Sequence, residues 1–222
     1  MISRLAVSSA RLAQGKAGLV VSLHQGDLAI WQGASALVTS SNESMSGNAN
    51  PSYWRFAGRA NVDGAIRSLS GNVAPPQQAL TPGSAIMTRA SWRSSTSPTS
   101  SAEWIIHTLV PDGAYGTGEK SPSAAEHTLQ QCYLSCLALA PGPVIAFPAL
   151  GCGVREWRTQ KAADVGFASL VLFARRQQEQ QQVSPLTEVQ FVFLDQNVLR
   201  VWAAIARKRF GDPLGERNLW DI

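Results

Sequence analysis

The chain has 222 residues, of which 45% are hydrophobic and 15% charged, and 19 Lys and Arg against 15 Asp and Glu give a formal net charge of +4. This length suits one compact domain, and the ordinary apolar content excludes collagen-like, coiled-coil and wholly disordered chains. The small positive charge is compatible with an anionic ligand, but not with the clustered basic surface typical of nucleic-acid binding. No apolar run approaches the roughly 20 residues of a membrane span, so we expect a soluble protein.

The start of the chain is poor in acidic residues, because Asp27 is the first of them. Such a segment with Arg and Ser is typical either of an organelle transit segment or of a disordered lead into the first strand. The three cysteines and three histidines show no metal-ligand spacing, so we expect neither a metal nor a cofactor. An odd number of scattered cysteines suits a reducing compartment, which favours an intracellular protein, cytoplasmic or nuclear unless the N-terminus directs it to an organelle.

Short apolar runs predict six strands along the chain. They are Leu19–Leu23, Ala36–Thr39, Ala85–Thr88, Trp104–Leu109, Val144–Phe147 and Val189–Leu194. All but the third are nearly continuous runs of Val, Ile, Leu or Phe, as in strands that are covered on both faces. We therefore expect most of these strands to lie in a buried, largely parallel sheet.

Helical spacing of apolar residues predicts helices at Ser123–Ala140 and Thr159–Arg176, and a final helix beginning near Asn197, its expected N-cap. The alternation with strands predicts an α/β fold, a three-layer α/β/α sandwich around a mixed, largely parallel sheet of about six strands. We place this domain at residues 18–212, between an N-terminal extension of residues 1–17 and a C-terminal tail of residues 213–222.

Ligands of open α/β sheets bind beyond the carboxyl ends of the strands. Pro148–Arg155 lies between a strand and a helix, and its two glycines allow backbone N–H groups to turn toward an anion; an ordinary turn is the alternative. Asn42 ends another strand, where its amide can bond a ribose hydroxyl. Asp63 stands where a helix begins, and an N-terminal cap is its alternative role.

These fragments, in this order, resemble the macro domain, the ADP-ribose-binding α/β/α module. The resemblance runs from about Gly18 to Phe210 and rests on Gly26–Leu28, Ala36–Asn42, Val62–Ile66, Ile106–Thr108, Ala146–Val154 and Phe191–Asp195. It implies adenine near Asp27 and Leu194, a ribose at Asn42 and the diphosphate on Gly151–Arg155. The implied ligand-binding residues are Asp27, Leu28, Asn42, Asn61, Val62, Asp63, Gly64, Pro148, Leu150, Gly151, Cys152, Gly153, Val154, Arg155 and Leu194.

The resemblance also implies hydrolysis of mono-ADP-ribosyl esters on acidic side chains, or of O-acetyl-ADP-ribose. Asp63 and Asn42 are the expected catalytic residues, with the Asp63 carboxylate orienting or deprotonating a water. The alternatives are a non-catalytic reader of ADP-ribose and a phosphatase acting on ADP-ribose 1″-phosphate. The expected partner is ADP-ribose or an ADP-ribosylated protein, and we expect a monomer that binds neither a membrane nor nucleic acid.

Several residues depart from the family pattern and favour binding over catalysis. Gly58–Asn61 replaces a run of glycines, and Arg67 replaces a histidine found in many hydrolases. Arg155 and Trp157 stand at positions of the second loop that are aromatic in the family; Arg155 either pairs with phosphate, folds over the ribose or is solvated. An inserted segment brings Trp54 and Phe56, as a lid or as core residues.

Two other features have competing interpretations. A nearby helix would lower the pKa of Cys152, although a small residue that merely fits the loop is the simpler interpretation. Gly113–Ser121 resembles a phosphate-binding P-loop, but Glu119 breaks the Gly-Lys-Ser register. We expect Gly113–Ser121 to be a flexible surface loop.

Overall fold

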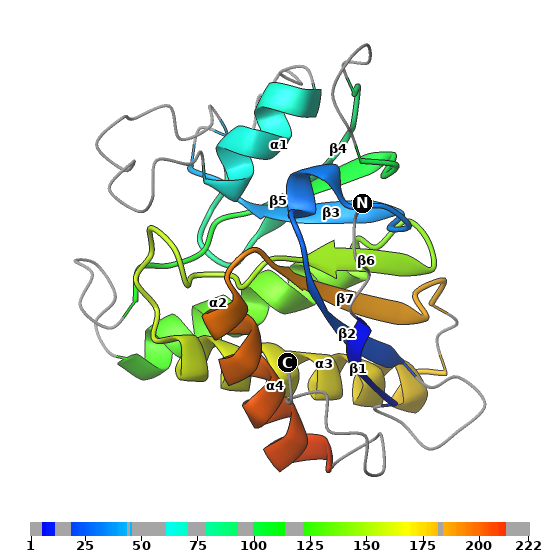
Figure 1. The fold of residues 1–222 in the computed structure, drawn as a ribbon, viewed down its shortest axis with the longest axis vertical. Helices are drawn as coiled ribbons and strands as arrows, with labels where there is room; N and C mark the ends of the chain where they lie inside the picture. Colours follow the sequence, from blue (N-terminus) through cyan, green and yellow to red (C-terminus); the bar gives the residue numbers. More distant parts are fainter. Residues whose placement is uncertain are drawn as a thin grey trace.

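The computed structural model of the protein describes residues 6–11, 19–43, 45, 61–70, 79–92, 100–113, 122–181 and 184–211. Seven strands within these residues form one sheet in the order β1-β2-β7-β6-β3-β5-β4 (Figure 1). They are β1 (Ala6–Arg11), β2 (Val20–Gln25), β3 (Ala36–Ser40), β4 (Ala85–Arg89), β5 (Trp104–Thr108), β6 (Val144–Phe147) and β7 (Glu188–Phe193). The six predicted strands are confirmed within two residues at each end.

The sheet is mixed but largely parallel, as predicted. Strands β2, β7, β6, β3 and β5 run parallel, whereas β4 pairs antiparallel with β5, and β1 pairs antiparallel with β2. The seventh strand, β1, lies within the segment that the sequence presents as an N-terminal extension. Its residues are too polar and too small to form an apolar run, so hydrophobic patterning gave no signal for it.

Helices cover both faces of the sheet, which confirms the three-layer sandwich. The short 3₁₀ helix η1 (Leu28–Ile30) and the helix α1 (Val62–Ser70) cover one face. The helices α2 (Pro122–Ala138), α3 (Thr159–Glu179) and α4 (Gln196–Phe210) cover the other (Figure 1). Strand residues alternate between the two cores, because successive side chains of a strand point to opposite faces.

The larger core is built around aromatic rings from the last strand and helix. Phe191 on β7 lies 5.8 Å from Phe147, 5.8 Å from Phe167 and 4.6 Å from Trp202, measured between ring centroids. Trp202 and Phe191 are fully buried, so α4 packs onto the sheet through one large apolar anchor. This packing fixes the strand end from which α4 begins.

Two helix starts differ from the sequence-based expectation. Asp195, not Asn197, is the N-cap of α4, and its Oδ1 accepts a hydrogen bond of 2.7 Å from the backbone N–H of Asn197. At α1, the side chain of Asn61 accepts a hydrogen bond of 2.8 Å from Gly64 N. Asn61 therefore caps α1, and Asp63 lies inside the helix, where it is free for another role.

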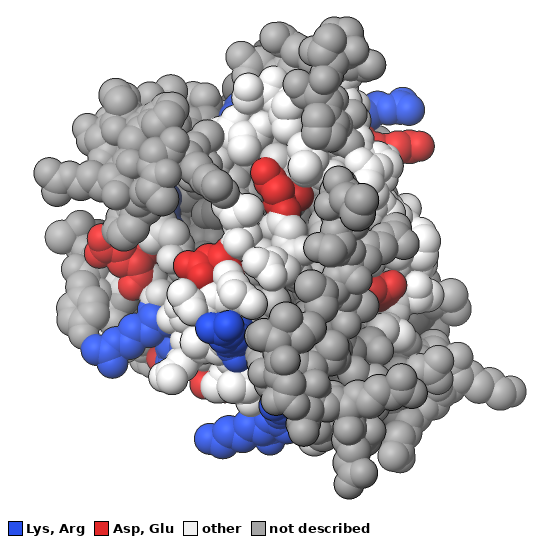
Figure 2. Space-filling view, viewed as in Figure 1, with Lys and Arg blue, Asp and Glu red and all other residues white. Residues whose placement is uncertain are grey.

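No helix within the described ranges is long and apolar enough to cross a membrane. Figure 2 shows one face of the molecule, on which Lys and Arg alternate with Asp and Glu and form no single-sign patch among the described residues. Several features singled out in the sequence lie outside the described residues. They are the inserted Trp54 and Phe56, the altered glycine segment 58–60 and most of the P-loop-like segment. The residues 213–222 also lie outside them.

Candidate functional site

The crevice of the sheet lies between β3 and β6, two parallel neighbours in the middle of the strand order. The chain leaves β3 toward α1 on one face and leaves β6 toward α3 on the other, which makes this gap a topological switch point. The two strands pair only at Ala36 and Leu37, so their carboxyl ends separate beyond that register. Separation of adjacent strand ends leaves room for a ligand.

A cavity of about 290 Å³ lies at this place. It is formed by the end of β3, the start of α1, the loop from β6 to α3 and one residue that follows β5. Its lining residues are Ser40, Ser41, Asn42, Asn61, Val62, Asp63, Asp112, Pro148, Ala149, Leu150, Gly151, Gly153, Val154 and Arg155. Segments that are more than 100 residues apart in the sequence therefore form one cavity wall, which contains both polar and apolar residues.

The loop from β6 to α3 is held by its own backbone. Gly151 has a φ of +85°, a conformation that favours glycine. Its carbonyl accepts a hydrogen bond of 3.0 Å from Trp157 N, and the Gly153 carbonyl accepts one of 2.9 Å from Glu156 N. No described residue accepts a hydrogen bond from the backbone N–H groups of Gly153, Val154 or Arg155. Consecutive unpaired N–H groups at a cavity wall provide donors for an anion.

One ion pair and two hydrogen bonds join the segment after β5 to this loop. The Arg155 guanidinium pairs with the Asp112 carboxylate at 2.7 Å, and Gly113 N donates to the Arg155 carbonyl at 2.6 Å. The indole N–H of the buried Trp157 donates to the Pro111 carbonyl at 2.8 Å. Arg155 is therefore ion-paired with Asp112 at the cavity wall, and its side chain stays partly exposed to solvent.

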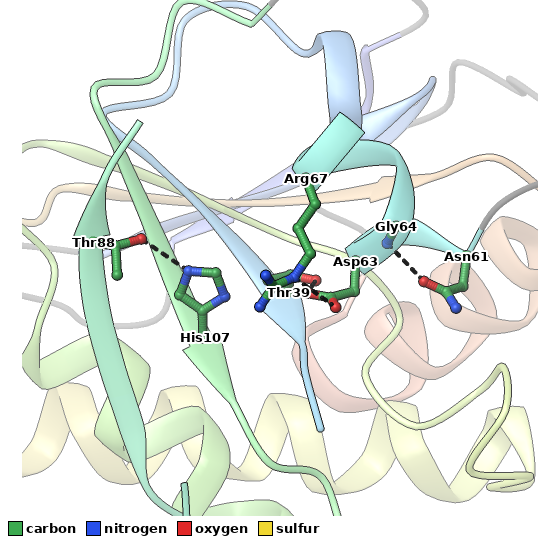
Figure 3. Close-up of polar contacts among 7 residues, drawn as sticks. All are labelled: Thr39, Asn61, Asp63, Gly64, Arg67, Thr88 and His107. Atoms are coloured by element: carbon green, nitrogen blue, oxygen red, sulfur yellow. Dashed lines mark hydrogen bonds and ion pairs between the residues drawn. The ribbon is translucent and has the colours of Figure 1, made fainter. Parts of the chain in front are cut away.

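Asp63 lies in a buried polar network at the start of α1 (Figure 3). Its carboxylate is only 3% exposed. Thr39 on β3 donates to Oδ1 at 3.1 Å, and Nε of Arg67, one helical turn further along α1, pairs with Oδ2 at 3.2 Å. Burial raises the pKa of Asp63 above its usual value, whereas the Arg67 charge and the hydrogen bonds from Thr39 and Arg67 oppose that rise.

His107 on β5 lies beside Thr39 in the parallel ladder. It is buried, and one ring nitrogen, Nε2, is 2.9 Å from the hydroxyl of Thr88 on β4. Burial and the nearby Arg67 charge lower the pKa of His107 to about 4. The imidazole is therefore neutral near pH 7, and its buried Nδ1 has no hydrogen-bond partner among the described residues.

The comparisons with known proteins agree with this architecture. The sequence profile described as the Macro domain matches residues 49–166, more than half of the chain. The chain belongs to the macro domain family. It is 27% identical over 185 residues to a Salmonella gallinarum protein named O-acetyl-ADP-ribose deacetylase, covering 80% of this chain and 89% of that one. A relative of the same name from Salmonella typhimurium is 26% identical over the same shares.

Solved macrodomains share the fold. A structure titled "Oceanobacillus iheyensis macrodomain with ADP" has a TM-score of 0.65 and 18% identity, with 91% of this chain and 96% of that chain covered. A Trypanosoma brucei macrodomain in complex with ADP-ribose has a TM-score of 0.61 and 19% identity, with 83% and 68% covered. These likenesses support the α/β/α sandwich of this macro domain.

Three predicted site residues of this macro domain lie outside the cavity lining, namely Asp27, Leu28 and Leu194. Gly26 N donates to the Phe193 carbonyl at 2.9 Å, so Asp27 and Leu194 follow adjacent strand ends. Asp27 caps η1 by accepting a hydrogen bond of 2.9 Å from Ala29 N, and Leu28 is buried. Leu194 is 53% exposed, so it is not a core residue.

Gly64 and Cys152 also lie outside the cavity lining. The N–H of Gly64 is used by the Asn61 cap. Cys152 is half-buried against the larger core, and burial raises the pKa of its thiol to about 11. This shift is opposite to the one that a nearby helix would give. Among the described residues, no three His, Cys, Asp or Glu side chains lie close enough to hold a metal ion.

Sequence reasoning missed four lining residues, Ser40, Ser41, Ala149 and Asp112. Ser41 and Ala149 lie directly next to predicted site residues and Ser40 lies two positions before Asn42, so reading every position of each strand end would have included them. The buried Ser41 hydroxyl has no hydrogen-bond partner among the described residues. Asp112 had no sequence signal, since its partner Arg155 is 43 residues away.

Proposed function

We propose that this macro domain binds ADP-ribose in the cavity between β3 and β6, and hydrolyses O-acetyl-ADP-ribose or mono-ADP-ribosyl esters of acidic side chains. The observation that carries the proposal is the row of backbone N–H groups at Gly153, Val154 and Arg155, which have no acceptor among the described residues and line the same cavity as Asn42 and Asp63. Backbone donors without a side chain in the way are suited to a diphosphate. An amide and a carboxylate at the same wall are suited to a ribose.

The proposed chemistry is an ester hydrolysis. A water oxygen attacks the acyl carbon, the bond between that carbon and the ribose oxygen breaks, and the ribose oxygen takes up a proton as the alcohol. Asp63 would orient the water and accept its proton, and Asn42 would hold the ribose hydroxyls. The Salmonella relatives, named O-acetyl-ADP-ribose deacetylases, support this assignment.

One observation favours the non-catalytic reader as a second candidate. Both oxygens of Asp63 already have partners in Thr39 and Arg67. A carboxylate held in this way accepts a hydrogen bond from a ribose hydroxyl readily, but it is a weaker base than the same buried carboxylate would be without Arg67, because the cation stabilises its ionised form. A reader would bind ADP-ribose with the same groups and release no acyl product.

Turnover of three substrates by the wild-type protein separates these functions. We expect release of acetate from O-acetyl-ADP-ribose or of ADP-ribose from a glutamate-modified protein, and no release of phosphate from ADP-ribose 1″-phosphate. Phosphate release alone would instead establish the phosphatase. ADP-ribose binding without any product would establish the reader.

Replacing the carboxylate tests its place in the hydrolysis. We expect Asp63→Ala to lower kcat by about 10²–10⁴-fold, the usual contribution of general-base assistance. The test measures kcat of the variant and of the wild type, and thermal unfolding shows whether the variant is folded. Unchanged turnover in a folded Asp63→Ala protein would remove Asp63 from the mechanism.

A further inference from the structure

The pair formed by Arg67 and Asp63 has an unusual position, because one member lines the cavity and the other does not. Asp63 is among the lining residues, whereas Arg67 lies one turn deeper along α1. The side chains of Arg67 and Asp63 are 11% and 3% exposed. Arg67 therefore does not line the cavity itself, but it contacts the carboxylate of Asp63, which does.

A buried carboxylate without a partner would take up a proton rather than remain charged. Among the described residues, few charged or polar groups face Asp63. Arg67 lies on α1, Thr39 on β3 and the neutral His107 on β5, while Asp112 and Arg155 line the same cavity and neutralise each other. Arg67 is the cation in direct contact with Asp63 among these groups.

The two contacts also fix the direction of the carboxylate. The hydroxyl of Thr39 binds Oδ1, and Nε of Arg67 binds Oδ2 (Figure 3). An ionised carboxylate has about four lone-pair sites, so roughly two remain for a water or a ribose hydroxyl. We propose that Arg67 is a positioning residue that holds the buried Asp63 as an oriented anion at the cavity wall. The effect of Arg67 on turnover rests on the proposed function, whereas its effect on the ionisation of Asp63 does not.

The proposal differs from a purely structural ion pair in its dependence on pH. If Arg67 supplies the charge that keeps Asp63 ionised, removing the cation moves the ionisation of Asp63 to higher pH. A variant without the cation then regains activity when the solution is made more alkaline. A structural defect would lower activity by the same factor at every pH.

The first test needs no substrate. The pKa of Asp63 is measured by NMR of ¹³C-labelled Asp side chains in wild type, Arg67→Gln, Arg67→Lys and the control Arg175→Gln, whose residue is exposed on α3. We expect Arg67→Gln to raise the Asp63 pKa by about one unit or more, Arg67→Lys to raise it less, and the control to leave it unchanged. An unchanged Asp63 pKa in both Arg67 variants overturns the proposal.

The second test measures kcat and KM for O-acetyl-ADP-ribose between pH 5 and 9. We expect Arg67→Gln to shift the acidic limb of kcat to higher pH by the same amount as the rise in its Asp63 pKa, so that its loss of kcat relative to wild type becomes smaller as the pH is raised. Arg67→Lys should lose kcat with little change in KM, because it keeps the charge but not the planar Nε donor. A loss of equal size at every pH overturns the proposal.

The two tests separate this inference from the proposed function. If the wild-type protein neither binds ADP-ribose nor forms product, the proposed function fails, while the Asp63 pKa still reports on Arg67. If Arg67→Gln does not fold, the Asp63 pKa is measured in Arg67→Lys instead. An Asp63 pKa in Arg67→Lys equal to that of wild type, together with unchanged kcat, then overturns the proposal.

Discussion

Among single residues, Gly151 has the most demanding position in the site. Its φ of +85° is left-handed, and a Cβ atom there would stand 2.6 Å from Cδ1 of Trp157. Trp157 cannot move away easily, since it is buried and its indole N–H is bonded to the Pro111 carbonyl. Gly153, two residues along the loop, has open space around it. Glycine is therefore required at the first position and not at the second.

We expect Gly151→Ala to lower the free energy of unfolding by about 1–3 kcal/mol, the cost of a strained backbone conformation with a steric contact. Gly153→Ala should change it by less than about 0.5 kcal/mol. Urea unfolding of the two variants and the wild type measures the difference. Equal stability of the two variants would show that the loop does not need its left-handed turn.

At the scale of elements, the loop from β6 to α3 and the segment after β5 form one wall of the cavity. The ion pair of Arg155 and Asp112 joins them, with side chains 28% and 41% exposed. Pairs as exposed as this contribute about 0–1 kcal/mol to stability. We expect Asp112 to affect the binding of an anionic ligand more than it affects stability, because its carboxylate places a negative charge at the wall where the phosphates would bind.

We expect Asp112→Asn to bind ADP-ribose about two- to tenfold more tightly than wild type, since the carboxylate no longer repels the diphosphate or competes for Arg155. Arg155→Gln should bind more weakly, and neither change should alter the free energy of unfolding by more than about 1 kcal/mol. Calorimetric titration with ADP-ribose measures both affinities. Weaker binding by Asp112→Asn would mean that its carboxylate itself holds the ligand.

For the whole molecule, hydrophobic patterning was sufficient to predict the layers, whereas the position of the cavity also depended on the glycine and polar residues that follow two strands and on the resemblance to the macro domain. The runs that end in Phe147 and Phe193 are buried on both faces, and such strands carry the clearest signal that a sequence gives. Strand β1 was missed because Ala6–Arg11 holds no apolar run. The capping role of Asn61 and the pairing of Arg155 depend on exact loop paths, which spacing along a chain does not specify.

Folding stability of the whole chain should depend on His107 below neutral pH. Burial and the Arg67 charge lower the pKa of His107 from 6.5 to about 4. As pH falls below 6.5, the unfolded chain takes up a proton that the folded protein does not, so stability is lost until about pH 4. Asp63, with its raised pKa, has the opposite effect, since the folded protein takes up its proton at higher pH than the unfolded chain.

A variant isolates the histidine from the other groups. Between pH 7 and 4.5 we expect the wild type to lose about 2–3 kcal/mol more unfolding free energy than His107→Gln. Urea unfolding at each pH provides the comparison, and Asp63 is present in both proteins. Parallel losses would mean that His107 takes up its proton in the folded protein as readily as in the unfolded chain.

In our proposal, the cavity between β3 and β6 holds both the diphosphate and the second ribose of ADP-ribose. Calorimetric titration of the wild-type protein with ADP-ribose, ADP and AMP measures what each of these groups contributes to binding. We predict affinity for ADP-ribose at least tenfold higher than for AMP, with ADP between them, because each added group gains contacts at Gly153–Arg155 and then at Asn42. Affinity for ADP-ribose no higher than for AMP would contradict the claim.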